Sequence, residues 1–197
     1  MPHLDVRGCV FAPVIDLPAD YEVYDFTAGY DPGRVLASPY GVGRYDEKRR
    51  GVYTTDLFAG ARDIHVGIDL AAPVGEAIRA FAEGTVHRFG YNSAPGDYGY
   101  TLITQHEVNG QTLWALHGHL SARSVEGRYE GQVVARGEVI AWVGDRHENG
   151  GWNPHLHFQL SLVRPEVADL PGAVSDADRA HALTIYPDPR LVLGALY

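Results

Sequence analysis

The sequence predicts an all-β protein built from antiparallel β-sheets packed as a sandwich or an open barrel. Short alternating apolar runs with frequent turn signals are typical of this class, and the 197 residues include 23 Gly and 12 Pro. The segments between the runs are too short for parallel βαβ units, which favours antiparallel pairing. Hydrophobic residues make up 45% of the chain, enough to bury one core. We expect a loop-rich N-terminal extension at 1–50, a core at 51–162 and a C-terminal extension at 163–197.

The two extensions carry turn signals and mixed charges in place of long apolar runs. Asp-Pro-Gly at 31–33 and Ser-Pro at 38–39 predict loops in the N-terminal part. Basic and acidic side chains mix between residues 44 and 50, a pattern typical of a solvated face. In the C-terminal part we expect a loop at 169–178. Further along, Tyr-Pro-Asp-Pro at 186–189 precedes a short apolar stretch.

The first chemically informative element of the core is a predicted strand at 64–70, which carries His65 and Asp69 four residues apart. Gly67 and the β-branched residues around it argue against a helix. Imidazole nitrogen and carboxylate oxygen are ligand types that zinc accepts. The His-x-x-x-Asp pair alone is a weak signal, because such pairs often arise by coincidence.

An Asn-Gly dipeptide at 109–110 lies between two apolar runs and predicts a β-hairpin. If these two residues form the whole turn, Leu102 faces His117 and Tyr100 faces His119 across the strand pair. His117 and His119 then share one face of the hairpin.

A third histidine, His106, shares that face but lies too far along the strand to join a site with His119. Six residues separate His106 from Tyr100, which corresponds to about 20 Å. We therefore interpret His106 as a pleat-facing or surface residue. His147 lies in a glycine-containing loop at 144–151, where solvent exposure is the usual outcome.

The most informative stretch is a predicted strand at 154–160 that carries His155 and His157. Alternate side chains of a strand point to one face, so both imidazoles face the same way. Two such rings either pack as satisfied core groups or bind a metal or a substrate. Two ligands from 64–70 and one from this pair give three protein ligands and leave a fourth position open. That arrangement is typical of catalytic zinc.

Taken in order, these motifs resemble the lysostaphin-type (LytM-like) zinc metallopeptidases, which cut peptidoglycan cross-bridges. The matching motifs are His65-x-x-x-Asp69, His119-Leu-Ser and Pro-His155-Leu-His157-Phe. The resemblance implies one zinc ion per chain, with His65, Asp69 and His157 as its ligands. It also implies that His119 and His155 are catalytic histidines that do not bind the metal.

The resemblance covers roughly residues 64 to 160 and implies a lysostaphin-type peptidase core. Two residues before His119 the family usually has an aromatic residue, often Tyr, whereas this chain has His117. His117 either supports the site or is a polar residue of an edge strand. The segment 92–98 lies near where family members line the substrate groove, with turn formation as the alternative. The candidates for substrate contact are Asn92, Asp97, Tyr98 and His117.

Amide hydrolysis needs a nucleophile, a proton acceptor and a group that stabilises the developing oxyanion. Zinc lowers the pKa of water and polarises the carbonyl. A neutral histidine can take the proton of the water, and a second can hydrogen-bond the oxyanion or protonate the leaving amine. We interpret His155 as the base and His119 as the stabilising group, and the sequence equally allows the reverse assignment.

Composition excludes several other kinds of partner. A net charge of -9 argues against binding to nucleic acid or to an anionic membrane surface. Cys9 is the single cysteine, so an intrachain disulfide and a cysteine-based zinc site are both excluded. The N-terminus lacks the pattern of a secretory leader, and no run of about 20 apolar residues predicts a membrane span. We therefore expect a cytoplasmic protein.

A cytoplasmic location conflicts with a cell-wall substrate, because peptidoglycan cross-bridges lie outside the cytoplasm. The stretches at 149–159 and 187–194 resemble a leaderless branch of these peptidases. In that branch the domain is often joined to a phosphotransferase and an aminotransferase, which suggests association with metabolic enzymes. The leading expectation is a zinc-dependent metallopeptidase that cleaves a peptidoglycan-type or glycine-rich peptide. The alternatives are a catalytically silent peptide- or ligand-binding module on the same fold and a cytoplasmic zinc amidohydrolase acting on non-peptide amides.

Overall fold

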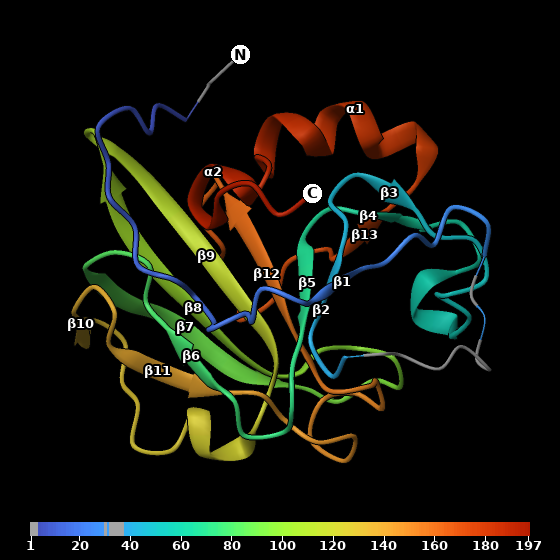
Figure 1. The fold of residues 1–197 in the computed structure, drawn as a ribbon, viewed down its shortest axis with the longest axis horizontal. Coiled ribbons are helices and arrows are strands. Elements are labelled where there is room, and N and C mark those ends of the chain that lie inside the picture. Colours follow the sequence, from blue (N-terminus) through green and yellow to red (C-terminus); the bar gives the residue numbers. More distant parts are fainter. Residues whose placement is uncertain (1–3, 30, 32–37) are drawn as a thin grey trace.

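The computed structural model describes residues 4–29, 31 and 38–197, and most regular structure in them is β-strand (Figure 1). Neighbouring strands of the main sheet run antiparallel, apart from the parallel pair at one edge. The prediction of an all-β fold with antiparallel sheets is therefore confirmed. The order of strands in the main sheet is β1 (Glu22–Val23), β2 (Gly41–Gly43), β5 (Ile68–Ala71), β12 (His155–Ser161), β9 (Gln111–Leu120), β8 (Gly99–Val108), β7 (Gly84–Asn92) and β10 (Val133–Val134).

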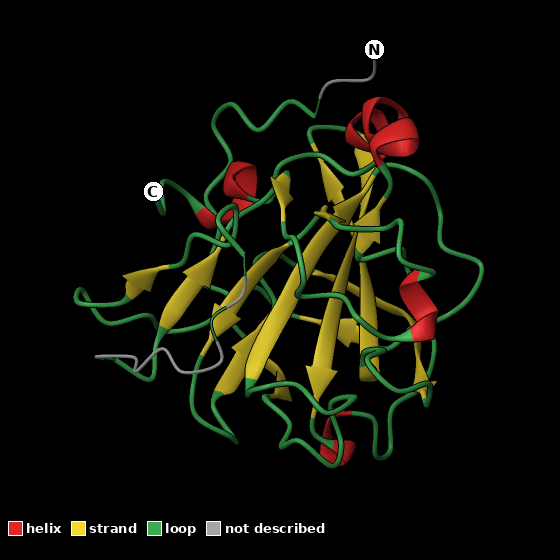
Figure 2. Ribbon diagram, turned by 90° about the vertical axis from the view of Figure 1, so that its right-hand side faces the viewer, coloured by secondary structure: helices red, strands yellow, loops and turns green. Residues whose placement is uncertain are grey.

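Two smaller sheets accompany the main sheet among the described residues. Figure 2 shows the long strands side by side in the middle of the molecule and the helical segments at its periphery. The smaller sheets pair β6 (Ala77–Arg79) with β11 (Val139–Trp142), and β4 (Ile64–His65) with both β13 (Ala173–Val174) and β3 (Glu47–Lys48).

The main hydrophobic core joins the main sheet to the β6–β11 pair, as expected for a sandwich. Leu102 and Phe158 of the main sheet belong to the same apolar cluster as Ile78 of β6 and Ile140 of β11, and all four side chains are fully buried. Burying such a side chain contributes about 1.5–3 kcal/mol. The core thus fixes one face of β12 and leaves the other face for polar groups.

β12 occupies the centre of the main sheet, between β5 and β9. His157 lies directly opposite Asp69 of β5 and Gly118 of β9. Opposed residues of an antiparallel pair have neighbouring side chains. Because Phe158 points into the core, His155 and His157 lie together on the opposite face, as predicted.

The hairpin of β8 and β9 follows the predicted register only as far as Leu102, which pairs with His117. Beyond this pair the register shifts, so Tyr100 pairs with Leu120 and not with His119. The prediction for Tyr100 was therefore wrong. The physical reason is a β-bulge, in which two residues of β9 lie opposite one residue of β8.

The bulge turns His119 to the other side of the sheet. Its backbone φ is 63°, in the left-handed region that residues other than glycine rarely occupy. The ring of His119 lies 4.2 Å from that of His155, whereas the ring of His117 lies 5.4 Å from that of Phe158 in the core. The predicted shared face of His117 and His119 is therefore wrong.

The N-terminal segment contributes strands as well as loops. β2 pairs with β5 in the main sheet, and β3 pairs with β4. Val14 and Ile15 are buried in the main core. The segment is thus part of the sheets and the core, and the expected boundaries at residues 50 and 162 stay a prediction.

The C-terminal segment is partly helical. The Ser175 hydroxyl accepts a hydrogen bond from the backbone N–H of Asp178, which caps the following helix. The loop predicted at 169–178 contains β13, and α1 (Asp176–Ile185) begins within it. The prediction of a loop is therefore wrong for the second half of this segment. The helical segments of the described chain are η1 (Asp56–Phe58), η2 (Ala122–Ser124), α1 (Asp176–Ile185) and α2 (Arg190–Leu193). No helix among the described residues combines the length and the apolar character that a bilayer crossing requires.

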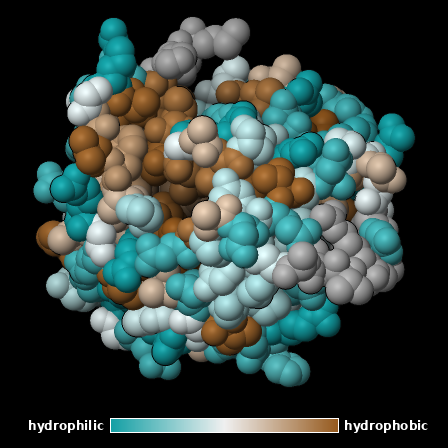
Figure 3. Space-filling view, viewed as in Figure 1, coloured by the Kyte–Doolittle hydropathy of each residue, from teal (hydrophilic) through white to brown (hydrophobic). Residues whose placement is uncertain are grey.

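An apolar hollow of about 680 Å³ lies between the N-terminal and C-terminal segments. Its lining includes Phe11, Leu17, Val192 and Leu193. Figure 3 shows apolar surface gathered around a hollow over α2 and the N-terminal segment. The described residues that line it include no histidine, so this hollow is separate from the site described next.

Candidate metal centre

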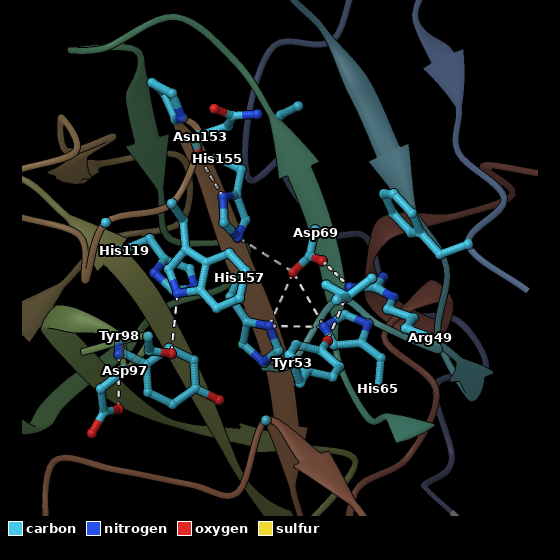
Figure 4. Close-up of a pocket in the computed structure, with 18 of the residues that line it drawn as sticks. Arg49, Tyr53, His65, Asp69, Asp97, Tyr98, His119, Asn153, His155 and His157 are labelled. Atoms are coloured by element: carbon cyan, nitrogen blue, oxygen red, sulfur yellow. Dashed lines mark hydrogen bonds and ion pairs between the residues drawn. The ribbon is translucent and has the colours of Figure 1, made fainter. Parts of the chain in front are cut away.

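Three candidate metal ligands meet at the centre of the main sheet: His65 of β4, Asp69 of β5 and His157 of β12. Nε2 of His65 lies 3.0 Å from Nδ1 of His157 and 3.2 Å from Oδ1 of Asp69. Nδ1 of His157 lies 3.0 Å from the same carboxylate oxygen. Figure 4 shows the three side chains pointing toward one another. The structure thus brings together the three residues predicted as ligands.

Gly67 makes room for this convergence. It lies between His65 and Asp69 in the sequence, and a Cβ atom at this position would be 2.5 Å from two ring atoms of His157. Carbon atoms in contact are normally about 3.5–4.0 Å apart. Only glycine therefore lets the backbone pass the imidazole at this distance.

Hydrogen bonds hold both ligand imidazoles in tautomers that turn a lone pair toward the centre. Nδ1 of His65 donates to the backbone carbonyl of Arg44 at 2.9 Å, because a carbonyl oxygen can only accept. Nε2 of His157 donates to Oε1 of Gln159 at 3.0 Å, since the amide nitrogen of Gln159 donates to the Pro171 carbonyl. Nε2 of His65 and Nδ1 of His157 are therefore left as acceptors.

The charge state of the site suits a cation. Burial lowers the pKa of His65 to about 4, and the nearby Arg49 guanidinium acts in the same direction. Burial raises the pKa of Asp69, but opposing effects that include the charge of the Arg49 guanidinium hold it well below its usual range. A neutral His65 ring and an ionised carboxylate thus present lone pairs to one point, where a positive ion relieves their repulsion.

The spacing of the ligand atoms also fits a metal. With metal–ligand bonds of about 2.0–2.1 Å, two ligands of a tetrahedral ion are about 3.3 Å apart. The separations of 3.0 and 3.2 Å between the three ligand atoms are close to this value. Donor type, tautomer and spacing therefore agree on a three-ligand metal site.

Two further histidines lie beside the ligands. Nδ1 of His119 donates to the carbonyl of Asn149 at 2.9 Å, and Nδ1 of His155 donates to the carbonyl of Asn153 at 2.6 Å. Nε2 of His155 lies 3.7 Å from Oδ1 of Asp69. Burial lowers the pKa of both histidines. The two rings are thus neutral proton acceptors next to the metal site.

A cavity of about 670 Å³ is lined by these five residues and by an aromatic wall. This volume is typical of pockets that bind small molecules or short peptides. Among the lining residues, burial and the charge of Asp97 raise the pKa of Asp169 to about 6. The aromatic wall consists of Tyr24, Phe26, Tyr53, Phe58 and Trp152.

The predicted substrate-contact residues separate into two groups. Asp97 and Tyr98 line the cavity, and the ring of Tyr98 lies 5.3 Å from that of His119. Asn92 is not among the cavity-lining residues, because its amide nitrogen donates to the carbonyl of Ala168 at 3.1 Å. The candidacy of Asn92 is thus not supported by its position, since it holds two chain segments together.

The other histidines among the described residues lie outside the cavity. His117 is fully buried outside the cavity, and its Nδ1 donates to the carbonyl of Leu102 at 3.1 Å, so its position does not support its candidacy for substrate contact. His106 is separate from the site, as predicted, but it is buried and hydrogen-bonded to the Glu83 carbonyl, so it is not a surface residue. His147 is exposed, as expected for its loop.

Arg49 is the residue of the site that sequence reasoning missed. Its Nη1 donates to Oδ2 of Asp69 at 2.5 Å. The side chains of Glu47 and Arg49 are each 3% exposed, so the prediction of a solvated face was wrong at these positions. The one available signal was their two-residue spacing, which places both side chains on one face of an extended segment.

Comparison with known proteins identifies the family. The model of peptidase family M23 matches residues 63–168, more than half of the chain. The DD-carboxypeptidase/endopeptidase Mpg of Neisseria meningitidis serogroup B is 37% identical over 122 residues, covering 59% of this chain and 26% of Mpg. The peptidoglycan DD-endopeptidase ShyC of Vibrio cholerae is 31% identical over 120 residues, covering 59% of this chain and 25% of ShyC. The chain thus spans about a quarter of the length of these relatives.

Among solved structures, the catalytic domain of the prophage-encoded M23 protein EnpA from Enterococcus faecalis is 27% identical, with a TM-score of 0.47. The similarity covers 72% of this chain and 92% of that domain. The segment matched by the family model contains all three candidate ligands and both further histidines. The chain belongs to peptidase family M23, which confirms the resemblance drawn from its motifs.

Proposed function

We propose that the chain is a zinc-dependent metalloendopeptidase that hydrolyses an amide bond of a peptidoglycan-type or glycine-rich peptide. The observation that carries the proposal is the convergence of three acceptor atoms at separations of 3.0 and 3.2 Å. A site with three protein ligands leaves a position for water or substrate. This supports hydrolysis in preference to a structural role for the metal.

Zinc is the ion that the donor set favours. Two imidazole nitrogens and one carboxylate oxygen suit a four-coordinate ion, whereas iron and manganese commonly bind more ligands. His65, Asp69 and His157 would hold one zinc ion per chain. When bound, zinc supplies Lewis-acid polarisation of the scissile carbonyl and lowers the pKa of water.

The two other histidines would carry the proton transfers. Nε2 of His155 is a neutral acceptor 3.7 Å from Oδ1 of Asp69, so it takes the proton of the attacking water. The ring of His119 lies 4.2 Å from that of His155, and with a proton taken from solvent at Nε2 it would hydrogen-bond the developing oxyanion or protonate the leaving amine. The two rings have the same tautomer, so their roles could also be exchanged.

The cavity and the relatives support a peptide substrate. The aromatic wall offers apolar contacts along about 670 Å³ of space beside the histidines. Mpg is a DD-carboxypeptidase/endopeptidase and ShyC is a peptidoglycan DD-endopeptidase. Peptidoglycan peptides are therefore the substrates to test first, and the cytoplasmic location stays a prediction that cell fractionation can check.

The test is a panel of muropeptides and glycine-rich peptides, incubated with zinc-loaded protein and analysed by mass spectrometry. We expect cleavage by the wild type and none by His157→Ala. Protein that holds one zinc per chain but cleaves no peptide would contradict the proposal and favour a binding module. Turnover of a non-peptide amide in a parallel metabolite screen would favour an amidohydrolase.

A further inference from the structure

We infer that Arg49 is a positioning residue that makes Asp69 offer a single oxygen to the metal. The inference rests on the proposed metal site and adds a residue outside the segment 63–168 that matches the family. Oδ1 of Asp69 faces the two ligand imidazoles, at 3.0 Å from His157 and 3.2 Å from His65. Oδ2 accepts a hydrogen bond from Nη1 of Arg49 at 2.5 Å. One oxygen of the Asp69 carboxylate thus faces the metal site, and the other is hydrogen-bonded to the guanidinium.

Arg49 is itself held in place, because each nitrogen of its guanidinium donates a hydrogen bond. Nε donates to Oε2 of Glu47 at 3.0 Å, and Nη2 donates to the carbonyl of Arg44 at 3.1 Å. Nη1 donates to the hydroxyl of Tyr53 at 3.1 Å, in addition to Asp69. The side chain is 3% exposed. A guanidinium fixed in this way can impose an orientation on the carboxylate that it contacts.

The same guanidinium reaches the first histidine ligand through one peptide group. The carbonyl oxygen of Arg44 accepts from Nη2 of Arg49 and also from Nδ1 of His65. Arg49 therefore acts on two of the three ligands, on Asp69 directly and on His65 through Arg44. Such outer hydrogen bonds orient metal ligands, and their loss typically costs about 10- to 100-fold in metal affinity.

Glu47 balances the charge of the buried Arg49 guanidinium beside the metal site. Its side chain is 3% exposed, and it accepts from Arg49 and from the backbone N–H of Phe26. Glu47, Arg49 and Asp69 together carry one net negative charge, so the site still attracts a divalent ion. Without Glu47, the guanidinium would cancel the charge of Asp69.

The consequence for the site is a fixed coordination number. A carboxylate that is free to turn can bind a metal through both oxygens, which adds a ligand and fills the position needed by water or substrate. The Arg49 contact keeps Oδ2 out of the metal site. The expected role is therefore to keep the ion four-coordinate.

The test uses the 197-residue chain loaded with Co²⁺ in place of zinc, because four-coordinate Co²⁺ absorbs visible light more strongly than Co²⁺ with more ligands. The variants are Arg49→Met and the charge-balanced pair Glu47→Gln with Arg49→Met, which avoids leaving Glu47 buried and unpaired. Arg49→Lys keeps the positive charge but replaces the planar guanidinium, with its several N–H donors, by one ammonium group. Arg50→Met is the matched control, because Arg50 is exposed next to Arg49. Metal affinity is measured on the same samples by competition with a chelator.

We expect weaker visible absorption and about 10- to 100-fold lower Co²⁺ affinity in all three Arg49 variants, with no change in Arg50→Met. Restoration by Arg49→Lys would show that charge alone suffices and would overturn the inference. Folded Arg49 variants with the wild-type spectrum and affinity would overturn it too, while leaving the metal site intact. Absence of Co²⁺ uptake by the wild type would instead overturn the proposed function, and with it the inference.

Discussion

Two parts of the chain build the candidate metal centre, and they contribute in different ways. The segment 63–168, which matches the family model, supplies the ligands and the two further histidines from strands at regular spacings. The segment before it, at 41–58, supplies Arg49, which donates to Asp69, and Tyr53, which accepts a hydrogen bond from Arg49. Both residues line the cavity. The comparison shows that the first part carries the ligands in recognisable motifs, whereas the second part supplies the hydrogen bonds that orient one of them.

Removing a ligand from the first part should have the largest effect. His157→Ala deletes one of three donors in a site whose charge suits a metal, so we expect loss of bound zinc and of all detectable hydrolysis. Elemental analysis of protein purified without chelator measures the first effect, and the peptide panel measures the second. His147→Ala, at an exposed position, is the matched control. One zinc per chain in folded His157→Ala would contradict the assignment of this ligand.

Removing a proton acceptor should separate chemistry from metal binding. His155→Ala leaves the three ligands in place, so we expect one zinc per chain and a kcat about 10²- to 10⁴-fold lower. Asn92→Ala is expected to keep kcat, because Asn92 lies outside the cavity. Full turnover by His155→Ala would remove it from the mechanism, and a parallel experiment with His119→Ala would then identify the base.

A substitution that crowds the His157 ring tests whether its displacement weakens metal binding as much as loss of the Arg49–Asp69 hydrogen bond does. In Gly67→Ala the new Cβ would lie 2.5 Å from the His157 ring, so the imidazole must move. We expect about 10- to 100-fold weaker metal binding, measured by chelator competition. Gly90→Ala is the control, because its Cβ would meet only Ala168, at 3.1 Å. Unchanged affinity in Gly67→Ala would mean that the sheet adjusts without disturbing the site.

The sequence was sufficient to predict the fold class and the convergence of the five histidine and aspartate residues. Strand periodicity places His155 and His157 on one face, and this feature depends on residues close in sequence. The contact of His65 and Asp69 with His157 joins distant parts of the chain, and it was implied by the family resemblance of the motifs. The site is therefore predictable as a set of residues.

The orientation of that site was not predictable in the same way. His119 reaches the site only because a β-bulge turns it, and regular pairing from the Asn-Gly turn placed it with His117. Arg49 lies in a run of mixed charges that normally marks a solvated surface. Its burial depends on Glu47, Tyr53 and the Arg44 carbonyl, which meet it only in the folded chain.

A separate effect, on stability and not on the metal site, concerns His117, whose ring packs against Phe158 in the core. Its Nδ1 donates to the Leu102 carbonyl, and its Nε2 has no hydrogen-bond partner among the described residues. Burial lowers its pKa to about 4, against about 6.5 in the unfolded chain. The folded state thus disfavours the protonated ring, so stability is full above pH 6.5 and falls as the pH decreases toward 4. The whole contribution is roughly 3 kcal/mol.

His117→Phe removes this titration and should flatten the acid side of the stability curve. Between about pH 4 and 6.5, the free energy of unfolding should fall less steeply than in the wild type, by about 1.4 kcal/mol per pH unit. Urea titrations of chelator-treated protein measure this slope without interference from metal release. The variant also deprives the Leu102 carbonyl of its donor, which lowers stability at every pH but leaves the slope unaffected. Parallel curves for wild type and variant would show that His117 is protonated equally in the folded and unfolded states, contrary to its burial against Phe158.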